Sequence, residues 1–183
     1  MTQIWVVRHG EATASWEKDP DPGLSGLGQS QAEETATALM DIVPVGAQLI
    51  SSPLRRARET AAVFANKRGD GVRVDARFSE VRSPVPMSGR KAWLQEFMRQ
   101  DWCEQSDDLW AWRRDILSGL KEATGPTVVF CHFLVINAAI AEIEKKPKVL
   151  QLYPANASFH ELKLERGELS LVQLGQQMET RIN

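Results

Sequence analysis

A histidine and an arginine follow a strongly apolar segment near the start of the sequence. Residues 4–7 read IWVV, and Arg8, His9 and Gly10 come directly after them. An unbroken apolar run is typical of a strand that is covered on both faces of a parallel sheet. Because open α/β sheets bind ligands at the carboxyl ends of their strands, we expect Arg8 and His9 at a binding edge. The plainer interpretation is a strand exit with an ordinary surface arginine and histidine.

A second apolar segment ends in the same way. Residues 127–131 read TVVFC, and His132 follows. If this strand is parallel to the first and beside it, the imidazoles of His9 and His132 can face each other at one edge of the sheet. With a reference pKa of about 6.5, imidazole can attack as a neutral nucleophile or hold an anion once protonated.

A further arginine lies near the start of a predicted helix. Residues 51–61 read SSPLRRARETA, in which Ser52 suits an N-cap and Pro53 the first helical position. A helix N-terminus favours anions, and the planar guanidinium groups of Arg8 and Arg56 are suited to phosphate. Together with the two histidines, these arginines predict a pocket for a phosphate dianion with an attacking atom inside it.

Helical and strand patterns alternate along the rest of the sequence, which predicts a three-layer α/β/α sandwich with a mostly parallel central sheet. The last two strands suit an antiparallel hairpin. Residues 82–106 break the pattern, and the tryptophans there and just beyond belong either to a lid over a pocket or to plain core. Helices are expected from Ser25 or Ser30 through residue 40, and over residues 53–68, 91–100, 109–122 and 133–142; strands are expected over residues 48–52, 72–79, 158–164 and 169–174.

The composition is that of a globular protein. The 183 residues are 43% hydrophobic and 25% charged, with a net charge of -2, so one domain is expected, with no nucleic-acid or membrane partner. We found no leader pattern and no apolar run near the ~20 residues of a membrane span, which predicts a cytoplasmic protein. The three histidines lack metal-ligand spacing, so neither a metal nor another cofactor is expected.

The sequence resembles the histidine phosphatase superfamily, which includes cofactor-dependent phosphoglycerate mutases. RHGE at residues 8–11 is similar to its signature, and SSPLRRARETA is similar to a second motif whose arginine before Ala, here Arg56, binds phosphate. Glu80 is similar in placement to the family's proton donor, and His132 to its second histidine. NASFHELKL at residues 156–164 resembles the closing strand segment.

The resemblance implies a phosphoglycerate mutase-like fold and a metal-independent, two-step phosphoryl transfer. His9 would form a phosphohistidine while Glu80 protonates the leaving oxygen, and water would then attack with Glu80 as base. Arg8, Arg56 and His132 would hold the charge of the transition state. The expected activity is hydrolysis of a small phosphomonoester or of a phosphohistidine on a protein. A phosphoglycerate-type mutase and a non-catalytic domain that binds a phosphoryl ligand or partner are the alternatives.

Several positions depart from the family pattern. Ala12 stands where the family often has Ser or Thr, and Ser15 where mutases have Asn. Ser15, or else Thr13, is a candidate for binding a phosphate oxygen. Phe133 follows the second histidine, where the family commonly has Gly, so it is expected to narrow the pocket or to move His132.

The surroundings of the proton donor also depart from the family pattern. Glu80 lies in EVRSPVP instead of the family's usual Gly- and Trp-containing surroundings, so Glu11 is an alternative donor. Glu80 would then be a solvated acid after a strand. Arg55 and Arg58 lie on other faces of their helix than Arg56 and are expected to be solvated, and His160 is expected to be structural.

Overall fold

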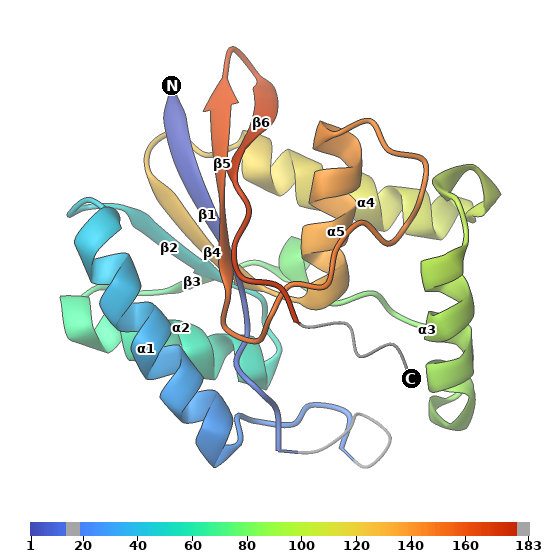
Figure 1. The fold of residues 1–183 in the computed structure, drawn as a ribbon, viewed down its shortest axis with the longest axis horizontal. Coiled ribbons are helices and arrows are strands. Elements are labelled where there is room, and N and C mark those ends of the chain that lie inside the picture. The colour runs from blue at the N-terminus through green and yellow to red at the C-terminus, as the bar shows by residue number, and fades with distance from the viewer. Residues whose placement is uncertain (14–18, 179–183) are drawn as a thin grey trace.

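The computed structural model describes residues 1–13 and 19–178, and Figure 1 shows its arrangement. The described strands form one sheet in the order β3-β2-β4-β1-β5-β6. The first three neighbouring pairs are parallel, and β1·β5 and β5·β6 are antiparallel. The elements are β1 (Thr2–Arg8), α1 (Gly26–Ile42), β2 (Gln48–Ser51), α2 (Arg55–Arg68), β3 (Arg73–Val74), η1 (Ala76–Phe78), η2 (Met87–Gly89), α3 (Arg90–Arg99), η3 (Trp102–Glu104), α4 (Asp107–Lys121), β4 (Thr127–Cys131), α5 (Phe133–Ile143), β5 (Phe159–Glu165) and β6 (Glu168–Gln173).

The central strand β1 is covered on both faces, as its apolar run predicts. Ile4 and Val6 pack in the core cluster that α4 and α5 complete, whereas Trp5 and Val7 pack in the cluster completed by α1 and α2. Figure 1 shows these two helix pairs on opposite faces of the sheet. The sandwich and its mostly parallel sheet are thus confirmed. None of the described helices is long and apolar enough to cross a membrane.

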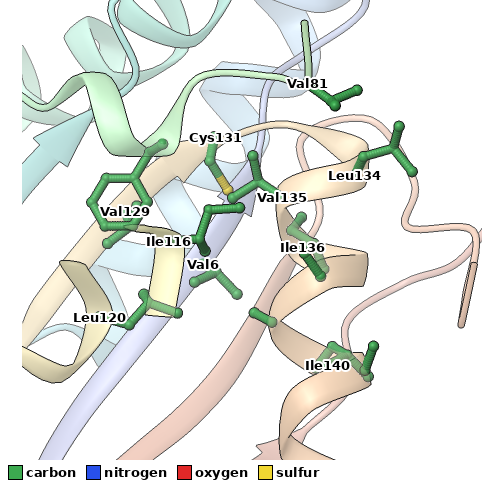
Figure 2. Close-up of a cluster of buried hydrophobic side chains, with 14 of the residues drawn as sticks. Val6, Val81, Ile116, Leu120, Val129, Cys131, Leu134, Val135, Ile136 and Ile140 are labelled. Atoms are coloured by element: carbon green, nitrogen blue, oxygen red, sulfur yellow. The ribbon is translucent and has the colours of Figure 1, made fainter. Parts of the chain in front are cut away.

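The core beneath α5 fixes the edge of the sheet at which β4 ends. Figure 2 shows Cys131 of β4 beside Val135 of α5, and Val129 of β4 belongs to the same cluster as Ile116 and Leu120 of α4. All of these side chains are at most 2% exposed. Because α5 begins directly after β4, this packing holds the connection between the strand and the helix in one place.

The prediction of a third strand over residues 72–79 is wrong for most of that range. Strand β3 covers only Arg73–Val74, and the chain then turns through η1. The Asp75 side chain accepts a hydrogen bond from the Arg77 backbone N–H at 3.0 Å and forms an ion pair with the Arg77 guanidinium at 2.7 Å. Capping by Asp75, together with the complete burial of Phe78, favours the turn over a longer strand.

The start of α2 also differs from the prediction. The helix begins at Arg55, and its N-cap position is Leu54, without a side-chain cap. Ser52, the predicted cap, accepts a hydrogen bond from the Leu54 N–H at 3.2 Å but also bonds to His132. The helix ends at Arg68, and its C-cap residue Gly69 takes a left-handed conformation with φ 71°.

Aromatic side chains between α3 and α4 belong mainly to the core. Phe97 and Trp102 are 1% and 2% exposed, and their ring centroids lie 6.0 Å apart in an edge-on arrangement. The Arg113 guanidinium carbon lies 4.4 Å from the Trp102 ring centroid and 5.0 Å from that of Trp110. These contacts join α3 and α4 to the face of the sheet covered by α5.

The turn after β1 packs unusually closely against the first turn of α1. A Cβ at Gly28 would lie 2.0 Å from the Glu11 carbonyl oxygen, and one at Gly10 would lie 2.4 Å from the Gly28 carbonyl oxygen. Ser25, one of the two predicted helix starts, caps α1 and accepts a hydrogen bond from the Gly28 N–H. Contact between these backbones therefore sets the direction in which the chain leaves His9.

This close approach makes Gly28 sensitive to a single methyl group. We expect Gly28→Ala to lower the free energy of unfolding by about 1–3 kcal/mol, because backbone atoms must move. Gly26→Ala in the same turn is the matched control, since nothing lies within 4 Å of its added Cβ. Urea denaturation measures the stability of both variants. Equal transition midpoints for Gly28→Ala and Gly26→Ala would contradict this prediction, because the turn after β1 could then move away from α1 with no loss of stability.

Candidate active site

His9 lies at the end of β1, and its backbone N–H donates to the Cys131 carbonyl oxygen at 3.1 Å. The ring is 9% exposed. Its Nδ1 lies 2.7 Å from the Gly10 carbonyl oxygen, which can only accept, so Nδ1 carries the proton. Nε2 therefore has a lone pair, and it accepts a hydrogen bond from Arg56 Nε at 3.0 Å. Nε2 is the ring atom that can attack.

Burial and neighbouring cations keep His9 neutral. Its pKa is lowered from 6.5 to about 3, first by desolvation and then by the charges of Arg56 and Arg8, against a smaller opposing effect of the Gly10 hydrogen bond. A group with a lowered pKa stays unprotonated at every pH well above that value. The Nε2 lone pair is therefore available throughout the neutral range.

His132 lies beside His9 because β1 and β4 are parallel neighbours, with Arg8 paired to Cys131. The two ring centroids are 5.1 Å apart, and the ring planes meet at 60°. His132 Nε2 lies 2.7 Å from Ser52 Oγ. Ser52 Oγ also accepts the Leu54 N–H, and its own hydroxyl proton can be donated to His132 Nε2.

When the Ser52 proton lies in this hydrogen bond, the neutral His132 ring carries its own proton on Nδ1. Nδ1 is buried and has no partner among the described residues. Complete burial, and then the charges of His9, Arg56 and Arg8, lower the pKa of His132 well below its usual value. His132 is therefore a neutral ring that offers one N–H donor to a ligand.

The two predicted phosphate-binding arginines approach the histidines from different elements. Arg56, the second residue of α2, is 8% exposed, and its Nη1 lies 3.9 Å from a carboxylate oxygen of Asp21. Arg8 ends β1, and burial lowers its pKa to about 10, although Glu80 raises it and Arg56 lowers it further. Both guanidinium groups remain charged at neutral pH.

Glu80 is not a solvated acid. Its Oε1 accepts the Val81 N–H at 3.0 Å, and its Oε2 accepts the Leu134 N–H in the first turn of α5 at 3.2 Å. The turn before it is fixed by Trp112, whose Nε1 donates to the Ser79 carbonyl oxygen at 3.0 Å. Glu80 is half-buried, and desolvation raises its pKa above the usual value, although these two hydrogen bonds and nearby arginines oppose the shift.

The other candidate acid is engaged elsewhere. Glu11 Oε1 accepts the Ser25 hydroxyl at 2.8 Å, so its carboxylate belongs to the cap of α1. Thr13 donates from its hydroxyl to the Gly23 carbonyl oxygen at 3.4 Å. Ser15, the predicted phosphate ligand, lies outside the described residues.

The sequence did not assign a role to two residues at the site. Ser52 was interpreted only as a helix cap, because its partner His132 is 80 positions away. Arg90 lies within residues 82–106, which the sequence marks only as a break in the pattern. It is half-buried at the start of α3 and donates to the Val81 carbonyl oxygen at 3.0 Å. Burial lowers the pKa of Arg90, and the nearby negative charge of Glu80 opposes this shift.

Three basic residues that were not predicted to bind phosphate lie as the sequence predicts. Arg55 and Arg58 are exposed, whereas His160 is fully buried in β5 and accepts the Gly175 N–H at 3.0 Å. Among the described residues, no group of three or more His, Cys, Asp or Glu side chains could hold a metal ion. The site therefore combines one nucleophilic nitrogen, several N–H donors and one half-buried acid.

Arg56 and Arg58 provide a matched pair on one helix. We expect Arg56→Ala to lower kcat/KM for p-nitrophenyl phosphate by about 100- to 1,000-fold, because a guanidinium beside the nucleophile is lost. Arg58→Ala, which removes the same group from the exposed face, should stay within about twofold. Steady-state kinetics decide the matter, and similar losses in both variants would exclude a specific role for Arg56.

Comparison with known sequences gives one family. The chain matches the model of the histidine phosphatase superfamily (branch 1) over residues 4–177. A protein of Escherichia coli named "Probable phosphoglycerate mutase GpmB" is 28% identical over 154 residues, which are 81% of this chain and 66% of that protein. Its namesake in Escherichia fergusonii is 28% identical over 130 residues, 69% of this chain and 54% of that protein. The chain thus spans about half to two thirds of these curated relatives.

Solved structures give the same fold. A mycobacterial glucosyl-3-phosphoglycerate phosphatase complexed with VO3 has a TM-score of 0.72 at 24% identity and covers 97% of this chain and 100% of its own. Entamoeba histolytica phosphoserine phosphatase with 3-phosphoglyceric acid has a TM-score of 0.72 at 20% identity, with 98% of each chain covered. YhfR of Bacillus stearothermophilus has a TM-score of 0.75 at 16% sequence identity and covers 97% of this chain and 98% of its own. The fold is that of phosphoglycerate mutase-like proteins, and with the family match over residues 4–177 the chain belongs to the histidine phosphatase superfamily.

Proposed function

We propose that this protein is a phosphatase that hydrolyses a phosphomonoester through a phosphohistidine on His9. The observation that carries the proposal is the state of the His9 ring: Nδ1 is bound to a carbonyl oxygen, and Nε2 is an unprotonated nitrogen beside a guanidinium group. A neutral imidazole among N–H donors is the arrangement that phosphoryl transfer to histidine requires.

In the first step, His9 Nε2 attacks the phosphorus, and the bond between phosphorus and the ester oxygen breaks. The leaving oxygen takes the proton of Glu80, whose raised pKa favours the acid form. As the phosphoryl group enters, Arg56 exchanges its hydrogen bond to His9 Nε2 for one to a phosphoryl oxygen. Arg8 and the His132 Nδ1–H hold the other oxygens, where the negative charge is spread.

In the second step, water attacks the phosphorus of the phosphohistidine. The Glu80 carboxylate takes a proton from this water, and the bond between Nε2 and phosphorus breaks. The products are inorganic phosphate and an enzyme with Glu80 protonated and His9 neutral, as before the first step. No metal and no further cofactor take part in this proposal.

The substrate is proposed to be a small phosphomonoester or a phosphohistidine on a protein. Residues 82–106 connect Glu80 to α4 and carry Arg90, so we propose them as the segment that selects the substrate. An anionic group near the phosphate would suit Arg90, whose guanidinium interacts with Glu80. Glucosyl-3-phosphoglycerate and phosphoserine, after which two phosphatases of similar fold are named, both carry a carboxylate besides the phosphate.

A phosphoglycerate-type mutase is the second candidate, because the curated relatives carry that name. This chain aligns with no more than two thirds of the length of those relatives. In contrast, it aligns with 98% or more of the length of the two phosphatases of similar fold. We therefore favour hydrolysis. A domain that binds a phosphoryl ligand without turnover would need an inactive His9 or Glu80.

A phosphoester panel assayed in EDTA separates the candidates. A phosphatase releases inorganic phosphate from p-nitrophenyl phosphate and from at least one metabolite or phosphohistidine protein. A mutase interconverts 2- and 3-phosphoglycerate faster than it hydrolyses either. Thermal stabilisation by phosphate with no turnover on any ester would instead identify a binding domain.

A further inference from the structure

The Arg8 side chain is enclosed by groups from three distant segments. Its Nη1 donates to the Pro154 carbonyl oxygen at 2.7 Å and lies 3.6 Å from the sulfur of Met178. The Phe133 ring covers the guanidinium group, with 5.3 Å between the guanidinium carbon and the ring centroid. A cation this close to an aromatic face is attracted by the ring. These contacts restrict how the guanidinium group can turn.

The Phe133 ring is itself fixed. It belongs to the first residue of α5, directly after His132, and is half-buried against the core. The ring of Tyr153 meets it edge-on, with centroids 5.9 Å apart and planes at 65°. The Tyr153 carbonyl oxygen accepts the Met178 N–H at 2.8 Å, so the segment behind the ring is also held. Arg8 thus rests on a supported surface.

A buried donor of Arg8 has no partner in the described part of the chain. Its Nε is buried and has no hydrogen-bond partner among the described residues. A buried donor without a partner is costly, and native sites of this kind are usually completed by a ligand or water. Arg8 directly precedes His9, is paired with Cys131 and contacts Phe133, the two residues that flank His132, so its guanidinium group lies at the same edge of the sheet as both histidines.

We propose that Phe133 is a positioning residue for phosphate recognition: its ring holds the Arg8 guanidinium so that Nη1 stays on Pro154 and Nε is presented to a phosphoryl oxygen. Phe133 does not touch the reacting atoms and acts only through Arg8. The residue that departs from the family's usual Gly after the second histidine thereby has a defined task. This inference rests on the proposed function, because the acceptor it assigns belongs to a phosphoryl group.

Calorimetry of inorganic phosphate binding tests the proposal. We expect Phe133→Leu to raise the Kd about threefold to thirtyfold, the range of a cation–π contact between exposed and desolvated settings. Phe133→Trp keeps an aromatic face and should stay within about twofold of wild type. Phe159→Leu makes the same change at a half-buried phenylalanine in the other core cluster and should not change the Kd.

The decisive measurement combines Phe133→Leu with Arg8→Gln. If Phe133 acts through Arg8, adding Phe133→Leu to Arg8→Gln changes the phosphate Kd by less than about twofold. If the ring only supports the fold, the two losses multiply, or Trp fails to restore binding, and the proposal is overturned. A wild type that neither binds phosphate nor hydrolyses any ester would instead refute the proposed function. If the wild type binds phosphate and hydrolyses an ester but Phe133→Leu has the same phosphate Kd, only the inference about Phe133 is refuted.

Discussion

His9→Ala is expected to abolish hydrolysis of p-nitrophenyl phosphate, with kcat lower by more than about a thousandfold. The variant loses the Nε2 lone pair that attacks phosphorus, and no other described nitrogen replaces it: the His132 Nε2 is bound to Ser52. Acid-labile 32P should appear on the wild-type protein after a brief incubation with a labelled ester and be absent from His9→Ala.

Two controls separate a lost nucleophile from a lost fold. His9→Ala should still bind inorganic phosphate, because Arg8, Arg56 and His132 remain. Arg58→Ala, an exposed residue on α2, should label as the wild type does. Activity of His9→Ala at a tenth of wild type or more, or label that persists on the variant, would mean that another group accepts the phosphoryl group.

The meeting of the two histidines was predictable from the sequence because each follows an unbroken apolar strand. Strands of that kind are buried on both faces, and β1 and β4 pair in parallel with Arg8 opposite Cys131. Once this register is fixed, His9 and His132 must leave the sheet at the same edge. Local pattern and general sheet geometry were sufficient, without knowledge of any side-chain contact.

The contacts that tune the site were not predictable in this way. The Ser52 hydroxyl bonds both to Leu54 N–H two positions away and to His132 eighty positions away, and only the first is visible in a capping pattern. Phe133 appeared only as an obstacle next to His132, because its contact with Arg8 joins residues 125 positions apart. Long-range side-chain contacts leave no periodic trace in a sequence.

The loop before Glu80 shows a different limit. The alternation of polar and apolar residues over 72–79 fits a strand. However, the Asp75 carboxylate accepts hydrogen bonds from the backbone N–H and the guanidinium group of Arg77, and these local bonds favour a turn over a strand. The resulting turn brings Glu80 to the N-terminus of α5, where Leu134 donates to it. The placement of Glu80 came from family resemblance, and its burial came from the fold.

Glu80→Gln should affect esters according to their leaving groups. An alkyl phosphate needs a proton on its departing oxygen, so its hydrolysis should fall by about 100- to 10,000-fold. p-Nitrophenolate leaves without a proton, so the first step on p-nitrophenyl phosphate should be much less affected. The second step still lacks its base. We therefore expect a burst of about one equivalent of p-nitrophenolate per active site, followed by slow turnover.

The pH profile provides the same test by another route. Glu80 must be protonated to act as the donor, and burial raises its pKa, so kcat/KM of the wild type on an alkyl phosphate should fall as pH rises through that pKa. Below it the acid form persists, and His9, with a pKa of about 3, stays neutral down to acid pH. Glu80→Gln should lose this alkaline decline.

Glu11→Gln is the matched control, since the Glu11 carboxylate is bound to the Ser25 hydroxyl at the cap of α1. It should keep both the alkaline decline and steady turnover. A burst in Glu11→Gln, with steady turnover retained in Glu80→Gln, would transfer the acid–base role to Glu11 and would require the turn after β1 to release its carboxylate from the cap. Because the two acids lie in different elements, one set of progress curves distinguishes them.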